Sequence, residues 1–244
     1  MHFTCLVFGD NVEEQLEPFY ELECSMDQEE MRNDSRAKFV EQFTTEELEE
    51  DFIRVKNEHP EHYYETLKDF AEDYHDCHQN KDDKNSWGRW TNPNSKWDWN
   101  SVGGRWSGAF KVKDYPKYND DLAIGRPGVF DKKPKQGYVD SIRLCDIDFE
   151  GMGIESIEET SKNWDEAQQK ILEGENHVHF SYGIHQDDTR ESYIKRHSTF
   201  STYSYLKDGE WICNDENENF YEDLNKILES LPEDTLLTMV DYHI

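Results

Sequence analysis

Two apolar runs of strand-forming residues, one near each end of the chain, constrain the fold more than any other feature. The run HFTCLVF at 2–8 is followed by Gly9 and Asp10, and the run TLLTMVDYHI fills 235–244. Short runs of β-branched and aromatic residues bounded by turn residues are typical of buried strands. Because buried backbone N–H and C=O groups need partners, we expect both runs to lie in one sheet.

The chain between these runs carries helical and hairpin patterns. The segment TTEE at 44–47 fits a capping box, and apolar residues follow it at helical spacing. Further helices are predicted from Pro60, over 164–172 and over 220–231, strands over 106–112 and 177–183, and a hairpin from 199–206 and 211–213. Together these patterns predict an α+β fold: a mixed sheet containing both terminal strands, helices on a face of that sheet, and an acidic helical insertion.

The charge of the chain is unevenly distributed. The formal net charge is −29, with −17 over residues 1–80, +5 over residues 81–144 and −17 over residues 145–244. We expect residues 1–244 to form a single α+β domain. Within it we place the acidic helical insertion at 26–80 and a basic loop region, rich in Trp, Gly and Arg, at 81–144.

This charge balance restricts the partners of the protein. An acidic surface repels nucleic acid and anionic membranes, so we expect neither direct nucleic-acid binding nor membrane binding, whereas a basic protein surface is attracted. No stretch approaches the ~18 apolar residues of a membrane span, and the N-terminus lacks the basic start of a signal peptide. Five scattered cysteines without C-x-x-C spacing argue against a disulfide framework and a structural zinc site. We therefore expect a cytoplasmic protein with reduced thiols.

Several longer segments resemble a known group of proteins. They are HFTCLVFGDN, NPNSKWDWNSVGGRWSGAF, GRPG, DIDFEGM and LPEDTLLTMVDYHI. Together they resemble a family of uncharacterised bacteriophage-encoded proteins that share NPNxKWDWxxxGGRW, DIDFEGM and a C-terminal TLLTxVDxHI motif. The resemblance covers both ends and the middle of the chain but not the acidic region 25–80. It implies a phage protein acting in the host cytoplasm, and it carries over no catalytic residue.

The central segment has the composition of a nucleotide pocket. Five of the seven tryptophans lie between positions 87 and 106, interleaved with arginine and lysine. Tryptophan faces stack on bases, guanidinium groups bind phosphate oxygens, and a Gly-Gly turn lets backbone amides approach an anion. The predicted ligand-binding residues are Arg89, Lys96, Trp97, Asp98, Trp99, Gly103, Gly104, Arg105 and Trp106. The alternative is that these tryptophans pin a glycine-rich loop to the protein's own core.

Two further clusters offer metal-ligating atoms. If CDIDFE at 145–150 is a strand, its carboxylates share a face, and Asp146 and Asp148 could hold Mg²⁺ with His243 from the C-terminal strand. The alternative is an acidic solvent face. His75, Cys77 and His78 carry ligands that suit zinc, but helical geometry directs Cys77 away from the two histidines. We therefore expect no cofactor, with Mg²⁺ as the single candidate.

Three functions are compatible with these residues. The first is capture of a small anionic, nucleotide-like ligand, which in a phage would suit counter-defence against a host immune signal. The second is an acidic decoy, a nucleic-acid mimic or inhibitor that binds a basic host protein. The third is a metal-dependent enzyme acting on a nucleotide. Because the sequence contains no G-x-S-x-G elbow and its cysteines at 5, 145 and 213 lie in apolar runs, we favour binding over catalysis.

Overall fold

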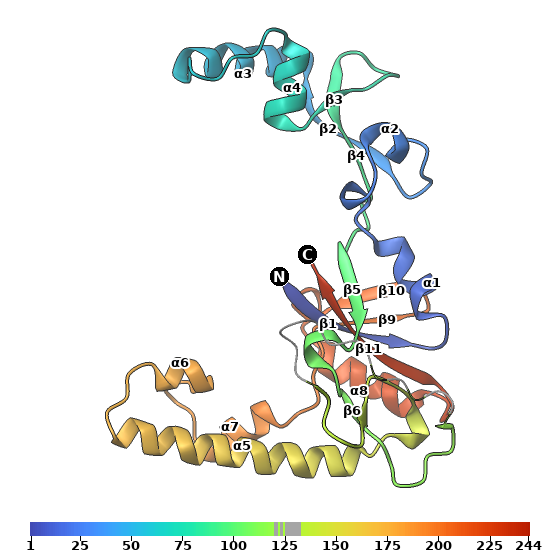
Figure 1. Cartoon of the computed structure of the whole chain (residues 1–244), viewed down its shortest axis with the longest axis vertical. Helices are drawn as coiled ribbons and strands as arrows, with labels where there is room; N and C mark the ends of the chain where they lie inside the picture. The colour runs from blue at the N-terminus through green and yellow to red at the C-terminus, as the bar shows by residue number, and fades with distance from the viewer. Residues whose placement is uncertain (120–121, 123, 125–132) are drawn as a thin grey trace. The chain divides into compact units, whose positions relative to one another are not determined.

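The computed structural model describes residues 1–119, 122, 124 and 133–244. The chain forms two compact units: unit 1 comprises Met1–Gln15 and Asn100–His243, and unit 2 comprises Leu16–Trp99 with the terminal Ile244. Figure 1 shows the elements of both units. The GRPG segment at 125–128 lies outside the described residues, as does Lys132.

Unit 1 is built on a mixed sheet that contains both ends of the chain. Its strands are β1 (His2–Phe8), β5 (Trp99–Val102), β8 (Ser141–Arg143), β9 (Ser204–Lys207), β10 (Glu210–Cys213) and β11 (Leu236–His243). The order is β10-β9-β1-β11-β5, and β8 also pairs with β11 (Figure 1). Strand β1 runs antiparallel to β11, with His2 opposite His243, and parallel to β9. The predicted α+β fold with both terminal strands in one mixed sheet is therefore confirmed.

The main core of unit 1 lies between this sheet and helix α8 (Phe220–Ser230). Leu6 on β1 and Met239 opposite it on β11 face the same side of the sheet, and both are buried in one cluster with Phe220 and Leu224 of α8. The remaining elements of unit 1 are α1 (Val12–Leu16), α5 (Phe149–Leu172), α6 (Val178–Tyr182), α7 (Arg190–His197), β6 (Phe110–Lys111), β7 (Tyr138–Val139) and the 3₁₀ turns η3 (Gly104–Trp106), η5 (Leu144–Asp146) and η6 (Asn214–Glu216). Helices α5, α6 and α7 share a second, smaller core.

Unit 2 combines a small sheet with short helices. Its antiparallel sheet has the order β2-β4-β3. The elements are η1 (Glu17–Phe19), η2 (Leu22–Cys24), α2 (Gln28–Met31), β2 (Lys38–Thr44), α3 (Thr45–Glu58), α4 (Leu67–His75), β3 (His78–Gln79) and β4 (Ser86–Thr91). The predicted capping box is confirmed: the Thr44 hydroxyl accepts from the amide of Glu47, whose carboxylate accepts from the amide of Thr44. The predicted 26–80 insertion thus contains strands as well as helices.

Three predicted elements are wrong. The segment 177–183 forms helix α6 instead of a strand, because His177 and Gly183 both adopt left-handed backbone conformations that bound one short helix. The segment 106–112 begins in the turn η3, and only Phe110–Lys111 is a strand. The helix predicted from Pro60 begins later, at Leu67, where the side chain of Thr66 forms a capping box. The start of this helix is therefore set by the capping box at Thr66 and not by the proline at position 60.

The segment 145–150 is also not a strand. It contains the turn η5 and the start of helix α5, and the carboxylate of Asp148 accepts from the amide of Gly151 at 2.9 Å. Asp148 is therefore a helix N-cap, which is a common position for aspartate. The region 81–144, for which a loop was the expectation, contains the strands β4, β5, β6, β7 and β8. The predicted hairpin (β9 and β10) and the predicted helix at 220–231 (α8) are confirmed.

Candidate functional site

The Gly-Gly turn of the central segment binds a carboxylate of the protein itself. The amide of Arg105 donates to Oδ2 of Asp241 at 2.9 Å, and Asp241 is fully buried on β11. The same carboxylate lies 3.0 Å from Nδ1 of His2. Gly104 has φ +52°, and a Cβ built on it would lie 2.3 Å from Asp241 Oδ2. Glycine is therefore required at 104 both by backbone conformation and by the close approach of this carboxylate.

A second buried carboxylate holds the residues that follow. Asp140 accepts from the hydroxyl of Ser107 at 2.7 Å and from the amides of Gly108 and Ala109 at 2.5 and 3.2 Å. A Cβ built on Gly103 would lie 2.4 Å from Asp140 Oδ2. These amides, together with that of Arg105, have an internal acceptor, so the turn folds around the chain's own anions.

The predicted ligand-binding residues fall in different units. Arg89, Lys96, Trp97, Asp98 and Trp99 belong to unit 2, and Gly103, Gly104, Arg105 and Trp106 to unit 1. Trp97 is half-buried, donates from Nε1 to the carbonyl of Leu16 at 3.0 Å and packs on Tyr20 at 4.7 Å between ring centroids. Arg89 pairs with Asp76 at 3.1 Å. The side chain of Arg105 is exposed, and Trp99 and Trp106 are 45% and 43% exposed.

The predicted metal ligands of the 145–150 segment have structural partners. Asp146 is buried and accepts from the amides of Lys117 and Tyr118 at 2.5 and 2.8 Å. Asp148 caps α5 and pairs with Lys111 at 3.3 Å. The ring of His243 packs against His2, with 5.0 Å between centroids. Each of these three side chains therefore has a structural role.

The histidines and cysteine near the end of α4 are also engaged separately. His75 contacts Asp51 at 2.9 Å, and His78 contacts Glu72 at 3.4 Å. Cys77 is buried and donates to Oε1 of Gln42 at 2.8 Å. Burial raises the pKa of the Cys77 thiol, which keeps it protonated and disfavours metal binding.

Among the described residues, one group brings three possible metal-ligating atoms within 4.8 Å of one another: Glu21, Cys24 and Asp98. The amide of Glu21 donates to the carbonyl of Trp97 at 2.8 Å, which sets the residues Glu21 and Asp98 side by side. Desolvation, followed by the charges of Glu21 and Asp98, raises the pKa of the Cys24 thiol. A soft metal ion would have to displace the thiol proton before binding.

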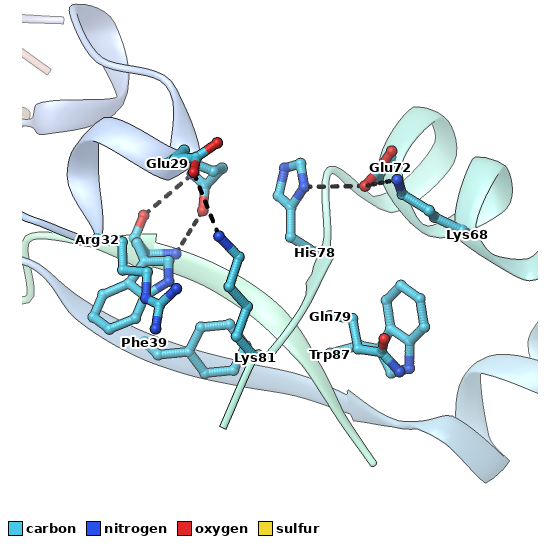
Figure 2. A pocket seen from close by; sticks show the side chains of 11 residues that line it. Glu29, Arg32, Phe39, Lys68, Glu72, His78, Gln79, Lys81 and Trp87 are labelled. Atoms are coloured by element: carbon cyan, nitrogen blue, oxygen red, sulfur yellow. Dashed lines mark hydrogen bonds and ion pairs between the residues drawn. The ribbon is translucent and has the colours of Figure 1, made fainter. Parts of the chain in front are cut away.

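Cationic and aromatic side chains gather around a cavity in unit 2. The cavity has a volume of about 470 Å³. Its lining residues are Gln28, Glu29, Arg32, Phe39, Lys68, Glu72, His78, Gln79, Lys81, Trp87 and Trp90. Figure 2 shows charged side chains on two sides of it, with Glu29, Arg32 and Lys81 on one and Lys68, Glu72 and His78 on the other. This volume is within the range of about 300–1,000 Å³ that is usual for small-molecule sites.

The cations of this cavity are only loosely paired. Arg32 lies 3.9 Å from Asp82, and Lys81 lies 3.6 Å from Glu29; both carboxylates are more than three-quarters exposed. On the other side, one oxygen of Glu72 lies 3.6 Å from Lys68 Nζ (Figure 2). Long, solvated ion pairs of this kind are weak, so a ligand can compete with them for the cations.

Aromatic rings form the apolar part of the cavity wall. Phe39 and Trp90 stand edge to face with centroids 5.8 Å apart. The amide of Trp90 donates to the side chain of Gln28 at 2.7 Å, which fixes this strand against α2. Trp87 is buried, and its Nε1 donates to the hydroxyl of Thr45 at 3.1 Å. The tryptophan-rich segment therefore supplies Trp87 and Trp90 to this cavity, although neither is among the predicted ligand-binding residues.

The cations of the cavity were missed because no local pattern connects them. Arg32 follows α2, Lys68 belongs to α4, and Lys81 follows β3. Only the tertiary structure brings these separated segments to one cavity. The signal available in the sequence was weak: they are three of seven Lys and Arg residues in a region that carries 30 charged residues over 1–81.

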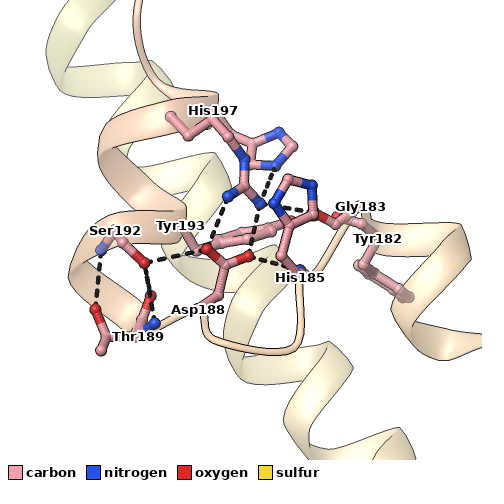
Figure 3. A network of polar contacts seen from close by, with 9 residues as sticks. Tyr182, Gly183, His185, Asp188, Thr189, Ser192, Tyr193 and His197 are labelled. Atoms are coloured by element: carbon pink, nitrogen blue, oxygen red, sulfur yellow. Dashed lines mark hydrogen bonds and ion pairs between the residues drawn. The ribbon is translucent and has the colours of Figure 1, made fainter.

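Unit 1 has its own dense polar network, around Asp188 in the loop before α7. Arg196 donates to both oxygens of Asp188 at 2.7 Å, and the amide of His185 donates to Oδ2 at 2.7 Å (Figure 3). These hydrogen bonds, that from Arg196 first, hold the pKa of Asp188 well below its usual range. The hydroxyl of Ser192 donates to Asp188 at 3.1 Å and accepts from the amide of Thr189 at the helix N-cap. The network thus fixes the start of α7 and resembles no nucleophile–base arrangement.

Within the part of the chain that the structure describes, no helix is long and apolar enough to cross a membrane. Comparison of the chain with family models, curated proteins and solved structures finds no match. The resemblance to bacteriophage proteins stays a prediction from the sequence. No match assigns an activity, so the geometry of the sites is the main evidence on function.

Proposed function

We propose that the protein captures a small anionic, nucleotide-like ligand in the unit 2 cavity. One observation carries this proposal: Arg32, Lys68 and Lys81 converge with aromatic rings on a cavity of about 470 Å³, in a chain of net charge −29. A local group of cations on an acidic protein favours a small anion, whereas the rest of the surface repels long polyanions.

Phosphate groups of the ligand would bind the cations. A solvated ion pair contributes about 0–1 kcal/mol, whereas a charged hydrogen bond contributes about 1.5–3 kcal/mol. Arg32 can therefore leave its distant contact with Asp82 for a bidentate contact with a phosphate. Lys81 can likewise exchange Glu29, 3.6 Å away, for a ligand oxygen.

The base of the ligand would pack on the aromatic wall. Stacking on an aromatic side chain contributes about 1–3 kcal/mol per base. Phe39 and Trp90 supply the rings, and the carboxylates of Glu29 and Glu72 supply acceptors for base or sugar donors. Capture of such a molecule in the cytoplasm of an infected host, as counter-defence, is the role that the resemblance to phage proteins supports.

The test is binding of a defined panel by isothermal titration calorimetry. The panel contains AMP, GMP, cyclic di-AMP, cyclic di-GMP and NAD⁺. We expect at least one member to bind, and the Arg32→Ala/Lys81→Ala variant to bind it ten- to a hundredfold more weakly or worse, the effect of one lost charged hydrogen bond. The matched control is Lys38→Ala, which removes an exposed cation of β2 outside the cavity. The proposal fails if no member binds or if the double variant binds as well as wild type.

A second candidate function has a specific observation in its favour. On helix α3, Glu46, Glu49 and Glu50 are exposed, and Ile53 is 62% exposed beside them. An apolar residue flanked by carboxylates is a possible contact for a basic host protein. We propose this acidic decoy as the alternative to ligand capture.

A further inference from the structure

A separate cavity in unit 1 is lined by the first half of α5 and the residues after α7. Its volume is about 290 Å³, near the lower end of the usual range for ligand sites. The wall includes Phe149, Met152, Gly153 and Ser156 from α5, with Ser198 and Phe200 from the opposite segment. All of these residues belong to unit 1, so this cavity is independent of the one in unit 2.

The glycine at position 153, inside helix α5, is the first feature of this cavity that points to a ligand. After proline, glycine is the least favourable residue in a helix interior, so its presence there needs a reason. For Gly151 the reason is local, since a Cβ at that position would lie 2.0 Å from the capping carboxylate of Asp148. For Gly153 a Cβ would meet no described atom within 4 Å, and its backbone does not have positive φ. The described protein therefore does not require this glycine, but the glycine leaves a flat backbone surface on the cavity wall.

Apolar side chains make the rest of the wall. Phe149 is 39% exposed, and its ring stands edge to face with that of Phe200 at 6.4 Å between centroids. Met152 and Phe200 are partly buried against the main core of unit 1. A flat ring inserted between the glycine surface and these side chains would remove apolar area from water on both of its faces.

The polar groups around the cavity indicate the charge of its occupant. The carboxylate of Glu155 contacts Lys111 Nζ at 2.7 Å and the Tyr138 hydroxyl at 2.8 Å, and Glu159 pairs with Lys135 at 3.1 Å. Because both lysines are already paired with these carboxylates, the polar groups around the cavity are close to neutral and attract an anion only weakly.

Two further polar groups are available for hydrogen bonding. In the described part of the chain, the hydroxyls of Ser156 and Ser198 form no hydrogen bond with the protein. Each can donate to and accept from a ligand. An occupant therefore needs a flat apolar body with hydrogen-bonding groups on its edge.

From this combination we propose a second ligand site that takes an uncharged, planar heteroaromatic molecule of nucleoside size. Its ring lies between the backbone surface at Gly153 and the side chains of Phe149 and Phe200, and its polar edge bonds to Ser156 and Ser198. The absence of a phosphate group distinguishes this occupant from the anionic ligand of unit 2. The proposal does not depend on the function proposed for that unit.

The experiment titrates adenosine, guanosine, cytidine and uridine into the full-length Arg32→Ala/Lys81→Ala variant by saturation-transfer NMR and calorimetry. That background removes two cations of the unit 2 cavity but keeps its aromatic rings, so the response to variants at Gly153 assigns the binding to unit 1. We expect at least one nucleoside to bind, and its 5′-monophosphate to bind at least fivefold more weakly because of Glu155 and Glu159. Failure of all four nucleosides to bind would overturn the proposal.

Variants at Gly153 separate ligand binding from stability. Gly153→Ala improves helix propensity, so its melting temperature should rise or stay constant while nucleoside affinity falls several-fold. Gly153→Leu should reduce the affinity at least tenfold by filling the cavity. Glu158→Leu places the same side chain on an exposed position of α5 outside the cavity and should bind as the background does. An unchanged nucleoside affinity in Gly153→Leu would show that the nucleoside does not bind in this cavity.

Discussion

Removing the buried carboxylate of Asp140 should selectively destabilise unit 1. In the Asp140→Ala variant, the hydroxyl of Ser107 and the amides of Gly108 and Ala109 lose their acceptor. An unsatisfied buried donor costs about 1–3 kcal/mol, so three donors that lose one shared acceptor should together cost about 3–5 kcal/mol when water partly replaces it. For a unit of this size, about 2–4 °C is lost per kcal/mol, so the melting temperature should fall by about 6–20 °C.

Scanning calorimetry combined with hydrogen exchange can test this prediction. The transition of unit 1 should shift, and exchange should accelerate in the peptide that spans 103–109, while peptides from β2 and β4 in unit 2 stay protected. Asp114→Ala is the matched control, because it removes an exposed carboxylate of the same unit and should change stability by less than about 0.5 kcal/mol. The smallest expected shift is about 6 °C, so a melting temperature of Asp140→Ala within about 2 °C of wild type would refute the role assigned to this carboxylate.

Three other changes test separate parts of the structure. Gly104→Ala should lower the melting temperature of unit 1 much more than Gly209→Ala does. Both positions have positive φ, but of the two only Gly104 faces a carboxylate, that of Asp241. Equal falls in melting temperature would attribute the effect to φ alone. The Arg36 guanidinium, mainly by hydrogen bonding, lowers the pKa of Asp34 from 3.8 to about 2. This contact therefore stabilises the fold above pH ~4, and its contribution is lost as the pH falls through about 2. Asp34→Asn should reduce the pH dependence of the urea unfolding midpoint over that window, and an unchanged pH profile would contradict the coupling. Replacing Glu46, Glu49 and Glu50 by lysine should slow association with a basic host partner recovered by pull-down and reduce the salt dependence of the association rate. Glu47 is left intact because it caps α3. An unchanged association rate would mean that these charges serve only solubility.

Elements set by local chemistry were predictable from the sequence. The terminal strands, the hairpin of β9 and β10, and helix α8 each combine a clear hydrophobic period with turn or breaker residues at their ends. The capping box at Thr44 was predictable for the same reason, since both partners lie within four residues. Elements were mistaken where two local readings competed, as at Asp148, which fits an alternating strand but acts as an N-cap.

The surroundings of the central turn could not be predicted from local patterns. The Gly-Gly pair at 103 and 104 correctly indicated backbone amides close to an anion, but nothing near it identified the anion as part of the chain. Asp140 and Asp241 are separated from this turn by more than 30 and 130 residues respectively. A glycine-rich turn marks a close approach, whereas the identity of the approaching group depends on tertiary structure.

The tryptophans of the central segment agree with both interpretations of the sequence, anchoring of the segment to the core and formation of a ligand site. Trp87 and Trp97 each donate from Nε1 to a protein oxygen, which agrees with the interpretation that tryptophans pin this segment to the core. Trp90 instead contributes its ring to a cavity with Arg32 and Lys81. Because an indole that bonds through its N–H is fixed in place, the pinned tryptophans can hold β4 and the segment before β5 rigid. A rigid β4 would present Trp90 to a ligand with less loss of conformational entropy on binding, so the structural and the binding interpretations support each other.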